Sequence, residues 1–190
     1  MIVDLSSILL TLIGLFPNLA VVFKQNKNHK LGRALTQFYF GTLNCIWLGE
    51  VIVNRVRNLL NTEGDKPPRD WEGDLASVNR FIDEQRIAIG RLQHDMWNLE
   101  KELNLVDPVS AHKLLITLPL KLHTLAGLQS ELYYFQDRLN KEGEESTQFY
   151  AYLQRYLTTN PPEERLQSMK ESAESIRLYI IDHFELGDIL

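Results

Sequence analysis

The residues whose types and spacing could do chemistry are Arg177 and His183, which are separated by five residues near the end of the chain. In-line cleavage of RNA requires a cation for the phosphate and an acid–base group that moves protons. The sequence contains no P-loop and no GxGxxG, GxSxG or HExxH motif. The other four histidines have no second ligand three or four residues away, so we expect no metal site and no cofactor.

The spacing from Arg177 to His183 resembles the Arg-x(4–6)-His motif of the HEPN superfamily. Members of this superfamily are all-helical domains that often act as metal-independent ribonucleases, usually with two protomers paired so that both Arg–His sets meet. The resemblance implies that Arg177 contacts phosphate and that His183 transfers protons. The chain departs from the family at Leu178, where a polar residue is favoured after the arginine.

The N-terminal region predicts a membrane anchor. Leu5 to Phe23 is a run of 19 residues without a charge, which is long enough to cross a hydrocarbon core of about 30 Å. It is followed by a basic flank, made up of Lys24, Lys27, Lys30 and Arg33. Such a flank tends to stay in the cytoplasm, which predicts a single pass with the N-terminus outside. A cleaved signal peptide and a buried core helix are the two alternatives.

Polar and small residues in this region recur every three or four positions, at Asp4, Ser7, Thr11, Gly14 and Asn18. On a helix they form one stripe, which should not face lipid because an unpaired polar group there is unfavourable. The stripe predicts either a packing seam between two helices or the lining of a pore.

A second apolar stretch runs from Phe38 to Val53 and contains Gly41, Cys45 and Gly49 at intervals of four. This spacing of small residues permits close contact between helices. We expect a helix that lies at the membrane interface or packs against its copies, and a second membrane span is the alternative. The aromatic residues at its start and Trp47 suit such a boundary.

Residues 71–190 are predicted to form an acidic helical bundle. This bundle follows a linker at 63–70, which contains two prolines. The first helix is expected over Trp71 to Leu103 with a regular seam: Val78, Ile82, Gln85, Ile89, Leu92, Met96, Leu99 and Leu103. Asp107 and Pro108 read as the cap and first turn of a second helix, and a shorter helix follows near 146–157. The last helix is expected to start after Asn160 and end near Phe184, with five residues inward: Leu166, Met169, Ala173, Ile176 and Ile180.

The fold class is therefore all-α, with an N-terminal membrane helix followed by an antiparallel helical bundle. The expected division is 1–62 for membrane-associated helices with a basic connector, 63–70 for the linker and 71–190 for the bundle. Residues 1–63 carry six basic and three acidic side chains, whereas 64–190 carry fourteen basic and twenty-two acidic ones. An acidic body argues against binding double-stranded DNA. The single cysteine, Cys45, excludes an intramolecular disulfide and CxxC or zinc-finger sites.

The layout of the chain resembles the small membrane accessory proteins of type VI-B CRISPR loci, which look like degenerate HEPN domains. The resemblance implies an antiviral effector of the bacterial inner membrane, with the bundle on the cytoplasmic side. It implies lipid and further copies of the chain as partners, and an RNA-guided nuclease or its RNA as a third. The expected function is a membrane-perturbing pore without catalysis. A membrane-tethered HEPN-type ribonuclease and a non-catalytic coiled-coil scaffold are the alternatives.

Overall fold

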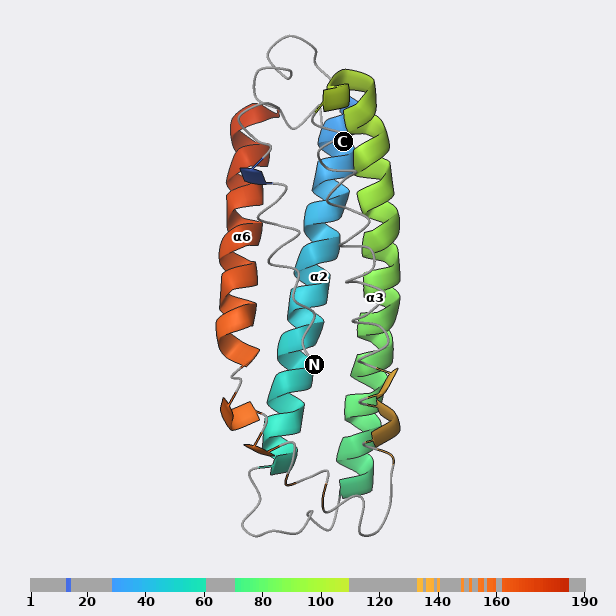
Figure 1. Ribbon diagram of the computed structural model, residues 1–190, viewed down its shortest axis with the longest axis vertical. Helices are drawn as coiled ribbons and strands as arrows, with labels where there is room; N and C mark the ends of the chain where they lie inside the picture. The colour runs from blue at the N-terminus through green and yellow to red at the C-terminus, as the bar shows by residue number, and fades with distance from the viewer. Residues whose placement is uncertain are drawn as a thin grey trace.

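The computed structural model describes residues 29–60, 71–109 and 162–184, together with 13–14 and isolated positions between 133 and 159. Three long helices make up most of this part: α2 (His29–Leu60), α3 (Trp71–Val106) and α6 (Pro162–His183). The described residues contain no strand, which confirms the all-α class. Helix α2 runs antiparallel to both α3 and α6 (Figure 1).

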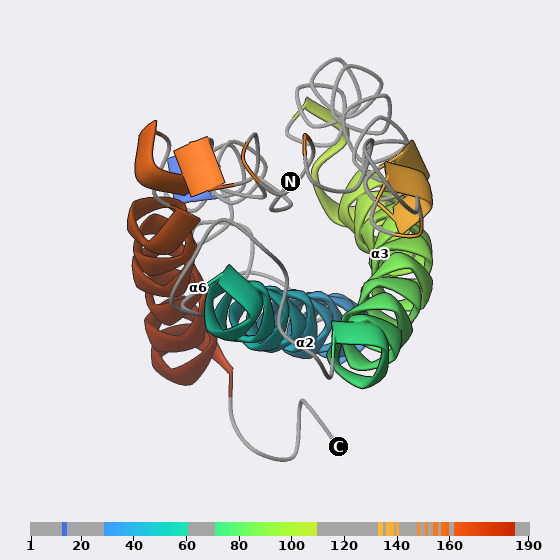
Figure 2. The same cartoon turned by 90° about the horizontal axis from the view of Figure 1, so that it is seen from below.

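The three helices form a curved layer with α2 in the middle. Helix α2 packs against α3 on one side and against α6 on the other. Viewed along the helices, α3 and α6 bend toward the same side of α2 (Figure 2). Helix α2 therefore has two flanks covered by helices and a third side turned into the hydrophobic core.

The seam predicted for α3 is confirmed. All eight of its side chains are buried, and none is more than 3% exposed. The regular spacing of three and four keeps them on one side of the helix, and that side is apolar enough to be covered along its whole length. Helix α3 extends three residues beyond the expected end, to Val106.

The only polar seam residue, Gln85, bonds across to α2. Its side-chain amide donates from Nε2 to the carbonyl oxygen of Cys45 at 3.0 Å. Gly41 and Cys45 of α2 lie at the same contact. A side-chain carbon built on Gly41 would lie 3.1 Å from Leu92 and from Asp95. The prediction that these small residues permit close helix contact is thus met by α3 of the same chain.

The apolar stretch from Phe38 to Val53 contributes to the core of the chain itself. It is the middle of α2, and Phe38, Ile46 and Ile52 belong to the core shared with α3 and α6. A helix covered on several sides is apolar nearly all round, so its sequence looks like that of a membrane-associated helix. Residues 29–60 share their core with helices on the other side of the expected linker. Among the described residues, no helix combines the length and the apolar character that a membrane span requires.

The predicted helix starts agree with the structure where they can be compared. Asp107 accepts a hydrogen bond at Oδ1 from the backbone N–H of Val109, 3.1 Å away, as an N-cap does. Helix α6 begins with Glu163 and Glu164 in its first turn, where the helix dipole favours acids. Its five predicted inward residues are all buried. The region 110–132, most of 141–161, and the linker lie outside the described residues.

Candidate functional site

Arg177 lies on α6 and is held by an acid of the same helix. Its Nε and Nη2 donate to the two carboxylate oxygens of Glu174, at 2.7 and 2.5 Å. These bonds lower the pKa of the Glu174 carboxyl and raise that of the guanidinium. The fork-shaped guanidinium matches a carboxylate in this two-bond geometry. A phosphate that binds Arg177 therefore has to compete with Glu174.

His183 is the last residue of α6 and lies against Tyr179. The two rings stack with their centroids 4.2 Å apart, and His183 Nδ1 lies 3.0 Å from the Tyr179 carbonyl oxygen. The carbonyl can only accept, so this contact favours a proton on Nδ1 and leaves Nε2 for other partners. Burial raises the pKa of the Tyr179 hydroxyl, which keeps this group neutral across the physiological range.

The two residues of the HEPN-like pair leave α6 in different directions. Six residues along a helix correspond to about 9 Å of rise and about 120° of rotation between side chains. Each side chain also has its partner on α6 itself. One chain therefore does not bring Arg177 and His183 to a common point, and a joint site would need residues from elsewhere.

Tyr39 and Phe184 are neighbours of this region that the sequence does not reveal. Tyr39 of α2 is half-buried, and its pKa is raised by burial and by the charge of Glu174, with Arg177 acting in the opposite direction. At the end of α6, the ring of Phe184 packs against Gly32, and a side-chain carbon built on Gly32 would lie 2.6 Å from this ring. This close approach is possible because Gly32 has no side chain.

A shallow groove separates α2 from α6 below this region. Val53 and Leu166 form its apolar floor, and Asn54 and Gln167 line it as well. An ion pair closes each end of the groove. Lys170 Nζ lies 2.5 Å from Glu50 Oε1 at one end, and Arg57 pairs with Glu163 at the other.

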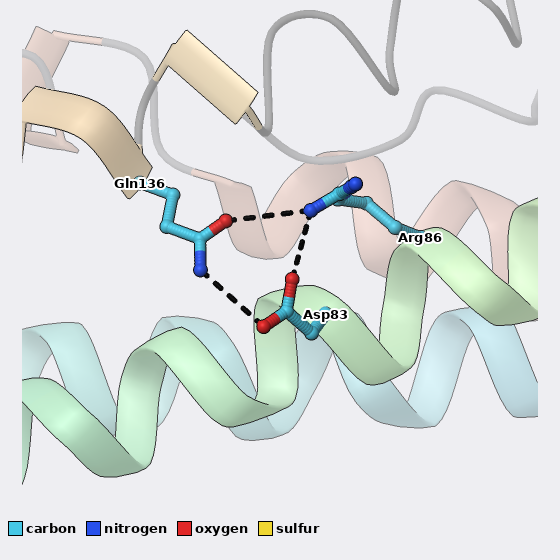
Figure 3. Close-up of polar contacts among 3 residues, drawn as sticks. All are labelled: Asp83, Arg86 and Gln136. Atoms are coloured by element: carbon cyan, nitrogen blue, oxygen red, sulfur yellow. Dashed lines mark hydrogen bonds and ion pairs between the residues drawn. The ribbon is translucent and has the colours of Figure 1, made fainter.

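A polar cluster connects α3 to the described helical residues around Gln136. Arg86 contacts Asp83 at 2.8 Å and the Gln136 side-chain oxygen at 3.4 Å, and the Gln136 amide reaches Asp83 at 3.4 Å (Figure 3). The guanidinium carbon also lies 3.8 Å from the centre of the Tyr133 ring, as in a cation–π contact. All these groups satisfy one another, so the cluster serves as a helix contact.

The predicted membrane residues can be located only in part. Asp4, Ser7, Thr11 and Asn18 of the stripe, like Lys24 and Lys27 of the basic flank, lie outside the described residues. Gly14 is exposed. Lys30 and Arg33 are exposed in the first turns of α2, so the flank continues directly into the helical layer.

The described residues contain no group of three His, Cys, Asp or Glu side chains that could hold a metal ion. Cys45 is buried, and burial raises the pKa of its thiol to about 12, so little reactive thiolate forms near neutral pH. Comparison with models of protein families, with curated proteins and with solved structures finds no match to this chain.

Proposed function

We propose that this chain is a membrane-anchored, oligomeric helical protein that permeabilises or depolarises the bacterial inner membrane as an antiviral effector, and that it acts without catalysis. The observation that carries the proposal is the uncharged run from Leu5 to Phe23 with its basic flank. A run of this length satisfies the span requirement, and the flank favours a helical body in the cytoplasm.

The arrangement around Arg177 supports a non-catalytic role. In-line RNA cleavage needs a phosphate-binding cation and a proton-transferring group that converge on one substrate. Arg177 is paired with Glu174, and His183 is stacked on Tyr179. Both contacts lie within α6 and strengthen that helix and its end, as charge pairs three residues apart do.

The test reconstitutes the full-length protein in vesicles of phosphatidylethanolamine and phosphatidylglycerol and measures dye release. The disruptive variant carries Leu10→Arg and Leu15→Arg inside the uncharged run, because each arginine near the centre of a span disfavours insertion by about 2.5–3.5 kcal/mol. The matched control carries Leu105→Arg and Leu178→Arg, which replace exposed leucines of the helical body.

We expect the wild-type protein and the control to need detergent, to float with vesicles and to release dye. The disruptive variant should lose all three properties while keeping its helical circular dichroism. A wild-type protein that stays in solution without detergent would show that Leu5–Phe23 is no anchor. Truncations should end before Lys24, because Leu31 and Ala34 of α2 belong to the core.

A further inference from the structure

One face of α2 carries a row of uncharged side chains from Gln37 to Asn58, and the exposed Arg55 lies at the edge of this face next to Phe81 of α3. We call this face the α2 seam; its residues are Gln37, Phe40, Asn44, Trp47, Val51, Asn54 and Asn58. They recur alternately three and four positions apart, so they lie in one row along the helix. Val51 is partly buried and the other six are exposed.

This composition is unusual for a solvated helix face, which is normally rich in charged residues. The side chains of Phe40 and Trp47 are 61% and 53% exposed, although they are among the largest apolar groups of the chain. Depletion of charge together with exposed aromatic residues is typical of the buried centre of a protein interface.

Among the described helices, α3 and α6 cover α2 on other sides and leave the α2 seam open. Helix α3 contacts α2 at Gly41 and Cys45, and α6 contacts it at Glu50 and Arg57. Phe38, Thr42 and Val56 are buried in the core. The seam residues point away from these three directions. Helices α3 and α6 lie toward the same side of α2 (Figure 2), and the exposed seam residues occupy the positions of α2 opposite its buried face.

The chemistry of the seam favours another copy of the same face over lipid or nucleic acid. Anionic headgroups and phosphates are attracted by clustered Lys and Arg, whereas Arg55 at the edge of the face is the one exposed cation of α2 between Gln37 and Asn58. Insertion into hydrocarbon would leave the amides of Asn44 and Asn54 without partners. An asparagine amide both donates and accepts hydrogen bonds, so the asparagines of two identical rows can pair across a two-fold axis. A charged side chain near such an axis would face the like charge of its own copy.

We propose that two copies of this chain pair through the α2 seam, with Phe40 and Trp47 packed between the helices and Asn44 beside its counterpart. The inference deepens the proposed function, because it names the contact through which that oligomer forms. An asparagine among the apolar residues of a helix–helix contact also restricts the register of the helices and the number of helices that associate.

The first test places a cysteine at the proposed contact by Asn44→Cys in the full-length protein. Mild oxidation should give a covalent dimer, since position 44 faces its own copy. The matched control is Asn104→Cys, at an exposed asparagine of α3, and it should remain monomeric on a denaturing gel. The wild-type chain is a second control, because its single cysteine is 1% exposed.

The second test combines Phe40→Glu with Trp47→Glu and measures the mass of the protein in mild detergent by light scattering. We expect the mass of the assembly to fall at least twofold, with helical content unchanged. Ile87→Glu is the matched control, since it removes an exposed apolar side chain from α3 and should leave the mass unchanged.

The failures of the two proposals are distinguishable. A protein that floats with vesicles but keeps its mass after both glutamate substitutions, and forms no dimer through position 44, would overturn the α2 seam contact and leave the anchor intact. Loss of vesicle binding with unchanged mass would show that the seam contacts lipid, which also overturns the pairing. A soluble protein that dimerises through position 44 would remove the anchor and retain the pairing.

Discussion

The carboxylate of Asp95 lies in a partly buried position, which disfavours its negative charge. It lies on α3 against Gly41 of α2, and burial raises its pKa, with the positive charge of His94 acting in the opposite direction. A carboxyl whose pKa is raised on folding binds its proton more tightly in the folded state. The protonated Asp95 carboxyl therefore contributes most to folding stability below the pKa of the unfolded state, about 3.9. This contribution is lost as the pH rises through the pKa of the folded state.

We predict that Asp95→Asn increases the free energy of unfolding at pH 7, because the amide removes the disfavoured charge. The gain should stay below about 1 kcal/mol, since the carboxyl is only partly removed from water. Denaturant titrations at pH 7 and pH 3 measure it, and the difference should shrink at pH 3, where the aspartate is protonated. Asp182→Asn, at an exposed position of α6, is the control. A destabilised Asp95→Asn protein at pH 7 would contradict the assignment.

The seam of α3 gives a prediction at the scale of an element, because it contains one polar residue among seven apolar ones. Gln85 donates to Cys45, while its side-chain oxygen is buried and has no hydrogen-bond partner. A buried polar atom without a partner is unfavourable by about 1–3 kcal/mol. Gln85→Leu should therefore leave stability unchanged or raise it, although it removes the bond to α2.

Ile89→Ala, one helical turn further along the same seam, provides the contrast. Ile89 is 0% exposed, and its truncation should reduce the free energy of unfolding by about 2–5 kcal/mol. Both variants are compared by urea unfolding of the detergent-solubilised protein. Equal losses at the two positions would mean that the Gln85 bond is needed for the α2–α3 contact.

The three helices also show which parts of the fold can be predicted from sequence. The periodicity of α3 and of α6 predicts most of their buried residues, because one face of each helix is covered and that face is apolar; it misses Ala88 of α3 and Ser172 and Tyr179 of α6, which are buried as well. For α2 the sequence does not predict the core shared with α3 and α6, because a helix packed against two neighbours and a membrane-associated helix have similar apolar compositions. Sequence spacing identifies Arg177 and His183 as a candidate pair. It does not predict the ion pair between Arg177 and Glu174 or the stacking of the His183 ring on Tyr179.

At the scale of the whole molecule, α2, α3 and α6 form one core across the linker. A fragment of residues 71–190 loses α2 and exposes the apolar faces that α3 and α6 turn toward it. We predict that this fragment aggregates or unfolds without a cooperative transition, whereas residues 24–190 unfold cooperatively. Thermal unfolding followed by circular dichroism tests this. A fragment 71–190 that melts as sharply as the longer protein would show that the bundle is independent of α2.

The question of catalysis also belongs to the whole molecule, because only an assembly could bring Arg177 and His183 together. If the protein acts on membranes without catalysis, Arg177→Ala and His183→Ala should leave dye release unchanged, and no RNA cleavage should depend on either residue. Glu174→Gln sharpens the experiment, since it frees the Arg177 guanidinium from its carboxylate partner. A ribonuclease in which Glu174 restrains the arginine would cleave RNA faster after Glu174→Gln and lose cleavage after either alanine substitution. That pair of results, measured on single-stranded RNA with the full-length oligomer, would replace the membrane proposal by the HEPN-type one.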